Sequence, residues 1–123
     1  MNAQKHTAKS RGFTIIEIMT VITVIGILAG ITIFSIGNWR TRTAQSEVSN
    51  DLHNVASAME AARNFSTGYP ATIPTTFKAS PNVTVTLKSS TSSTYCVEAA
   101  SKVVTTVVYK VSNSNRTPAA GTC

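Results

Sequence analysis

Two patterns of apolar residues occupy the first half of the chain. Residues 18–36 contain no charged side chain, and a helix of that length, rising about 1.5 Å per residue, crosses the roughly 30 Å core of a membrane. After Trp39 the apolar positions recur at alternating steps of four and three, as in a helix with one buried face. These positions are Ala44, Val48, Leu52, Val55, Met59 and Ala62. Since no proline interrupts residues 13–65, we expect one helix over that range.

The polar residues between these apolar positions define the other face of the helix. We place six of them there: Gln45, Glu47, Asn50, Asp51, Asn54 and Glu60. The apolar stripe fits either the packing of the helix against a sheet or a free-standing coiled coil. We favour the sheet.

The second half of the chain has the composition of a loop followed by strands. Residues 66–81 combine one glycine and three prolines with many Ser and Thr, which predicts a connecting loop. Alternation and β-branched residues then predict strands over 82–88, 95–99 and 103–111. The loops between them have hairpin lengths. The expected fold is therefore α+β: a long helix whose outer half carries a three-stranded antiparallel sheet, followed by a polar tail.

One carboxylate, Glu17, stands at the head of the apolar run. An acid within a membrane segment is costly and calls for a functional reason. The residues before it carry Lys5, Lys9 and Arg11 but no acid, as is typical of a cytoplasmic flank. A secretory signal has its small-residue cleavage site after the apolar run. Here the small residue, Gly12, precedes it.

The order of basic leader, Gly12, Phe13-Thr14-Ile15-Ile16-Glu17 and apolar helix resembles the class III prepilin signal of type IV pilins and pseudopilins. The resemblance implies that a prepilin peptidase cleaves between Gly12 and Phe13, and that the new amine of Phe13 is methylated. It also implies that Glu17 attracts the terminal amine of a neighbouring subunit during filament assembly. The alternative is an uncleaved membrane anchor that tolerates an acid near its end.

With this resemblance the chain divides into four expected segments. They are a cleaved leader over 1–12, the transmembrane and polymerisation half of the helix over 13–38, its amphipathic half over 39–65, and an extracellular head over 66–123. Trp39, with Arg40 and Arg42, marks the outer boundary of the membrane that the helix crosses. Indole rings favour the interface, and Arg side chains extend out of it. Gly26 and Gly30 form a Gly-x-x-x-Gly pair that lets helices approach closely or, alternatively, weakens the helix locally.

Charge adds little to this picture. The formal net charge is +6, but the leader holds three of the eleven Lys and Arg, so a chain without it carries +3. Much of the basicity therefore indicates the orientation of the chain in the membrane and not the binding of a ligand. The remaining cations are scattered without interleaved aromatic residues, which gives only slight support for binding DNA or another polyanion.

The two cysteines, Cys96 and Cys123, have two open interpretations. If this part of the chain is exported, an oxidising compartment favours a disulfide, and pilins commonly carry one near their C-terminus. The alternative is two free thiols. We expect neither a metal site nor a cofactor, because two cysteines and two distant histidines do not supply four ligands.

No catalytic constellation is present in the sequence, so we expect a protein that is not an enzyme. His6 and His53 fall on opposite sides of the expected cleavage site, and there is no nucleophile elbow or phosphate loop. The resemblance implies a filament subunit, first in the cytoplasmic membrane and then in an extracellular pilus used for adhesion, twitching motility or DNA uptake.

The implied partners follow from that role. They are further copies of the chain, the prepilin peptidase, the pilus assembly machinery in the membrane, and DNA or cell surfaces as ligands of the filament. One alternative within the family is a minor pilin or a pseudopilin of a type II secretion system. Another, of a different class, is a single-pass, membrane-anchored binding module that does not polymerise.

Overall fold

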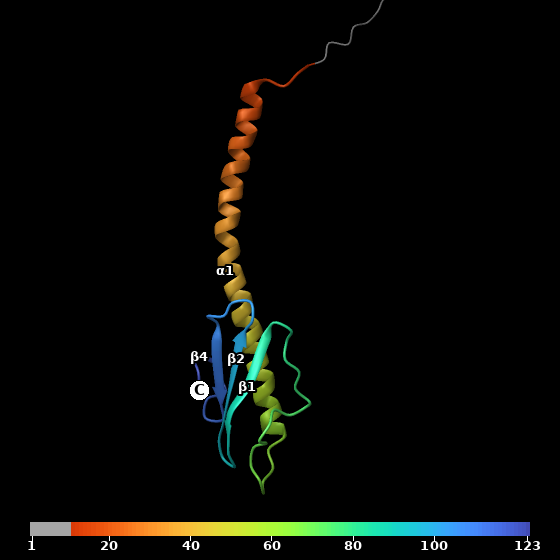
Figure 1. Ribbon diagram of the computed structural model, residues 1–123, viewed down its shortest axis with the longest axis vertical. Helices are drawn as coiled ribbons and strands as arrows, with labels where there is room; N and C mark the ends of the chain where they lie inside the picture. Colours follow the sequence, from red (N-terminus) through yellow and green to blue (C-terminus); the bar gives the residue numbers. More distant parts are fainter. Residues whose placement is uncertain (1–10) are drawn as a thin grey trace, which may run out of the picture. The chain divides into compact units, whose positions relative to one another are not determined.

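The computed structural model describes residues 11–123, so the expected leader lies outside the described residues apart from Arg11 and Gly12. Helix α1 is followed by four strands (Figure 1). Their bounds are α1 Ile15–Ala61, β1 Val83–Ser90, β2 Tyr95–Ser101, β3 Val108–Ser112 and β4 Ala119–Ala120. The chain forms two compact units, one that ends at Ile36 and one that spans Gly37–Cys123.

In the first unit, α1 displays apolar side chains around its whole circumference. From Phe13 to Ile36 the large apolar side chains are 44–85% exposed. The hydroxyls of Thr20, Thr23 and Thr32 each donate to a backbone carbonyl about one turn earlier, at 2.7–2.9 Å. These polar groups therefore have partners within the helix, as an apolar environment requires. By length and composition α1 can cross a membrane.

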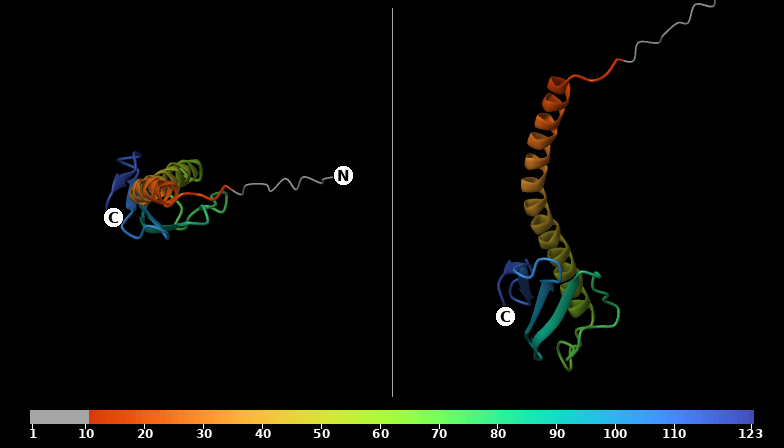
Figure 2. Two further views of the ribbon diagram at one scale, coloured as in Figure 1. Left: turned by 90° about the horizontal axis from the view of Figure 1, so that it is seen from above. Right: turned by 45° about the horizontal axis from the view of Figure 1, so that its top comes forward.

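In the second unit, the apolar stripe of α1 packs against one face of the sheet (Figure 2). Leu52 of α1 and Val97 of β2 are fully buried, and Val111 of β3 is 1% exposed. The buried stripe residues are Ala44, Val48, Leu52, Val55 and Met59. This confirms the predicted packing of helix against sheet. Ala62, expected in the stripe, is exposed and lies just beyond the end of α1.

The sheet has four strands in the order β1-β2-β3-β4, and each pairs antiparallel with its neighbour. The prediction of three strands was therefore wrong. The additional strand is β4, which pairs with β3 through Tyr109↔Ala120 and Lys110↔Ala119. A two-residue strand carries no alternation that a sequence pattern can reveal.

The third predicted strand, 103–111, also starts too early. β3 begins only at Val108, because a turn precedes it. The Ser101 hydroxyl accepts hydrogen bonds from the backbone amides of Val103 (3.2 Å) and Val104 (3.1 Å). The Val107 amide donates to the Val104 carbonyl at 2.9 Å. These local bonds outweigh the β-propensity of the valines.

Asp51, expected on the polar face of the helix, is 4% exposed. Its Oδ2 accepts from the Ser80 amide at 2.7 Å, and its Oδ1 accepts from the Ser80 hydroxyl at 3.0 Å. The carboxylate therefore holds the end of the segment between α1 and β1 against α1. The two residues lie 29 positions apart in the chain, so helical periodicity does not indicate the contact.

Replacing Asp51 with Ala is expected to lower the free energy of unfolding by about 1–3 kcal/mol, because the part-buried Ser80 amide loses its acceptor. Urea unfolding of the full chain in detergent micelles, followed by near-UV circular dichroism, measures this loss. The matched control is Asn54→Ala, at an exposed position on the same helix. Equal unfolding midpoints for the two variants would contradict the role given to Asp51.

Candidate functional site

The first candidate site lies where α1 begins, around Thr14 and Glu17. Oε2 of Glu17 accepts hydrogen bonds from the Thr14 amide (2.7 Å) and from the Thr14 hydroxyl (2.9 Å). In return, the Glu17 amide donates to the Thr14 hydroxyl oxygen at 3.3 Å. This reciprocal pattern is a capping box, which supplies partners to groups that the first turn of a helix leaves unpaired.

The capping box is a role of Glu17 that our sequence reasoning missed, although its Thr-x-x-Glu signal is present at 14–17. The sequence pattern indicated a pairing of Glu17 with the terminal amine of a cleaved chain. In the uncleaved chain the nitrogen of Phe13 is an amide, so Thr14 supplies the local partner instead. Both bonds use Oε2, and within residues 11–123 no hydrogen bond reaches Oε1.

The Gly12–Phe13 peptide bond, the expected cleavage site, lies just before this helix start. Both residues are exposed and outside the helix, and the Phe13 side chain is 85% exposed. A Cβ added to Gly12 would meet nothing within 4 Å. A peptidase can reach the backbone of such a segment without unwinding the helix.

Gly26 and Gly30 lie one turn apart on the exposed part of α1. A Cβ built on either glycine meets nothing within 4 Å. Two glycines four residues apart leave a flat strip on the helix surface, against which a second helix can pack closely. In the structure this strip is open.

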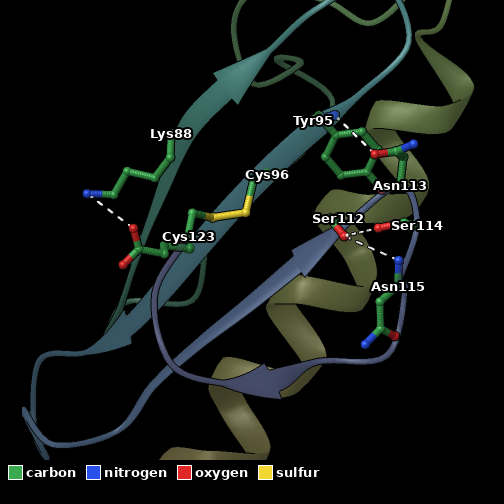
Figure 3. Close-up of a disulfide and its surroundings, with 9 residues drawn as sticks. Lys88, Tyr95, Cys96, Ser112, Asn113, Ser114, Asn115 and Cys123 are labelled. Carbon is green, nitrogen blue, oxygen red and sulfur yellow. Dashed lines mark hydrogen bonds and ion pairs between the residues drawn. A yellow bond between two sulfur atoms is a disulfide. The ribbon is translucent and has the colours of Figure 1, made fainter.

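The second candidate site is the disulfide between Cys96 and Cys123, whose Cα atoms are 6.1 Å apart. The structure therefore contains a disulfide and not two free thiols. Figure 3 shows it on the face of the sheet away from α1, as expected because the flanking Tyr95 and Val97 point inward. Beside it, Lys88 and Glu98 form an ion pair at 3.2 Å.

A tyrosine cluster in the second unit joins the end of α1 to the segments around it. The Tyr69 ring meets the Tyr95 ring edge-on at 4.7 Å. The Tyr69 hydroxyl donates to Oε1 of Glu60 at 2.8 Å, and Arg116 contacts the same oxygen at 3.1 Å. Burial, followed by the neighbouring Glu60 carboxylate, raises the pKa of both tyrosines. Both therefore stay protonated at neutral pH and act as structural groups.

His53, the one histidine within 11–123, is exposed on α1. Across the same residues, no three His, Cys, Asp or Glu side chains come close enough to hold a metal ion. The described residues do contain an exposed apolar helix, whose first turn carries Glu17 in a capping box.

A comparison with protein families points to the same end of the chain. Residues 7–36 match the family described as the prokaryotic N-terminal methylation motif. Over 60 residues the chain is 37% identical to the type IV major pilin protein PilA of Myxococcus xanthus strain DK1622. The match covers 49% of this chain but only 27% of that relative's length. Part of this chain is therefore similar to a prokaryotic N-terminal methylation motif and to a type IV major pilin.

Proposed function

We propose that this chain is the precursor of a filament subunit. A prepilin peptidase cleaves it between Gly12 and Phe13 and methylates Phe13, and the apolar helix holds the product in the cytoplasmic membrane. The assembly machinery then polymerises it through this helix into an extracellular pilus. The observation that carries the proposal is the exposed apolar surface of α1 from Ile15 to Ile36, which starts directly at the Thr14 and Glu17 cap.

Such a large exposed apolar surface is unfavourable in water. A helix that is apolar on every side is stable only when lipid or other helices cover it. Lipid covers it before assembly, and the helices of neighbouring copies cover it in a filament. The open strip at Gly26 and Gly30 allows these helices to approach closely.

Glu17 provides a specific contact between subunits during assembly. A carboxylate in a low-dielectric environment is favourable only when a positive group and hydrogen bonds satisfy it. In a filament this positive group is the methylated amine of Phe13 on a neighbouring subunit. The carboxylate then serves as a contact between subunits, beyond its local bonds to Thr14.

The candidate functions differ in where the chain is found and in whether it enters filaments. A minor pilin or a type II secretion pseudopilin shares the expected processing and the membrane helix, whereas a major pilin dominates filaments on the cell surface. A membrane-anchored binding module keeps its leader and never appears in filaments. Adhesion, twitching motility and DNA uptake are the roles to assay in a strain that lacks the chain.

Mass spectrometry of filaments sheared from the cell surface tests the proposal. The expected result is an abundant chain that begins with N-methylated Phe13. The matched control is Gly12→Val, which is expected to keep the leader and stay in the membrane; its Cβ meets no neighbour, so the described fold remains intact. Finding only chains with an intact Met1 or an Ala3 start, confined to the membrane, would overturn the proposal.

A further inference from the structure

A hollow of about 150 Å³ lies in the second unit, between the first turns that α1 contributes there and the turn that joins β2 to β3. We call it the Trp39 hollow. Its lining includes Trp39, Arg40, Thr43, Glu47, Asn82 and Val103. Two large apolar side chains at this hollow are exposed to solvent: Trp39 is 66% exposed and Val103 is 58% exposed. Figures 1 and 2 show the β2–β3 turn beside α1.

The turn that carries Val103 is held by hydrogen bonds on both sides. The Ser101 hydroxyl binds the amides of Val103 and Val104. The Lys102 amide donates to the Asn82 carbonyl at 2.8 Å, and the Lys102 ammonium group donates to the Pro81 carbonyl at 3.0 Å. Val104 packs against the core, whereas Val103 points outward. The fold thus displays Val103 on a fixed support.

The position of Trp39 indicates what this surface meets. Trp39 follows the apolar run, which ends at Ile36, by three residues, and indole rings favour the boundary between lipid and water. A side chain that shares a hollow with an interfacial Trp lies at nearly the same depth. Val103 is therefore placed to enter the same boundary region, although it comes from the head and not from the helix.

The charges around the hollow select the kind of surface. Arg40 and Glu47 line the hollow itself, and the flanking segments 37–47 and 101–107 add the cations Arg42 and Lys102 but no further acid. Anionic headgroups attract such an excess of cations. A symmetric contact between two copies would instead bring like charges together, which is unfavourable.

We propose that the Trp39 hollow and the β2–β3 turn form a second membrane contact. Val103 inserts beside Trp39, and Arg40, Arg42 and Lys102 contact anionic phospholipid headgroups. The head of the unassembled subunit then rests on the membrane. This inference depends on the membrane anchoring in the proposed function, and it adds a lipid class and a docking surface.

The test uses the one tryptophan of the chain. Full-length protein is reconstituted into phosphatidylcholine vesicles, with or without phosphatidylglycerol, whose acyl chains carry bromine as a quencher. Three proteins are compared: wild type, Trp39→Phe with Val103→Trp, and Trp39→Phe with Phe65→Trp. Phe65 is the matched control, because it is fully exposed and lies beyond the C-terminal end of α1. That end is about 33 Å along the helix from Trp39.

The expected result is strong quenching of Trp39 and of V103W, with F65W unquenched. Phosphatidylglycerol should increase the quenching of V103W by roughly twofold. The pair Arg40→Glu and Lys102→Glu should remove that increase, whereas Arg63→Glu, which lies beyond the far end of α1, should leave it unchanged.

Failure of the membrane anchoring and failure of the second membrane contact give different results. If Trp39 is not quenched, the membrane anchoring in the proposed function is wrong. If Trp39 is quenched but V103W behaves like F65W, the anchoring stands and the second contact is wrong. The emission of V103W could instead be blue-shifted without quenching by brominated lipid, with a shift that grows with the protein-to-lipid ratio. That result would identify a protein contact and would also overturn the inference.

Discussion

Replacing Glu17 with Gln is expected to abolish filament assembly while leaving cleavage between Gly12 and Phe13 intact. Gln is compatible with a capping box, so the bonds to Thr14 can be kept while the negative charge is lost. A neutral amide cannot satisfy the cationic amine of a neighbouring subunit in an apolar environment. We expect sheared filaments to fall by roughly a factor of ten or more. Immunoblots of sheared and membrane fractions measure the loss, and mass spectrometry confirms the processed end.

The same experiment separates the two roles of Glu17. Thr14→Val removes the hydroxyl of the capping box but keeps the carboxylate, so we expect filaments to persist at a reduced level. Normal filaments from E17Q would show that Glu17 serves only as a cap. Accumulation of uncleaved E17Q precursor would show that it acts in processing, and either outcome would contradict the assembly role.

Replacing Gly68 with Ala is expected to cost about 2–4 kcal/mol of unfolding free energy, combining backbone strain with overpacking. Gly68 adopts φ +82°, and a Cβ there would overlap the backbone of Ser92. The surrounding hydrogen bonds leave little freedom to move: Gly68 exchanges two backbone bonds with Asn64, and the Tyr69 amide donates to the Thr91 carbonyl. Urea unfolding of the full chain in micelles measures the effect.

The chain contains its own control for this variant. Gly121 also has positive φ, at +117°, but a Cβ there meets nothing within 4 Å. Gly121→Ala therefore carries only the strain of the backbone conformation, about 1 kcal/mol. If both variants lost the same stability, close packing of Gly68 against Ser92 would play no part.

Features encoded by local periodicity were predictable from the sequence. The stripe from Ala44 to Met59 indicated the buried face of α1, and the alternation of Tyr95, Val97 and Ala99 indicated the buried face of β2. In each case a repeating pattern of neighbouring residues determines which side is covered. The methylation motif was similarly readable, because its residues are contiguous.

The features that escaped prediction depend on single contacts between distant residues or on very short elements. The bond from Ser80 to Asp51 places a carboxylate inside the head, where helix periodicity alone would put it in water. β4 has two residues, too few for a pattern. Ser101 converts a β-branched run into a turn through two side-chain bonds, and no propensity scale includes that contact.

The disulfide has a mechanical consequence for the edge of the sheet. β4 is joined to β3 through only two residue pairs, a ladder that a modest pull would separate. Cys123 follows β4 and is bonded covalently to Cys96 of β2. Tension applied beyond β4 therefore passes to an interior strand through a covalent bond, and the weak ladder at the edge is spared the load.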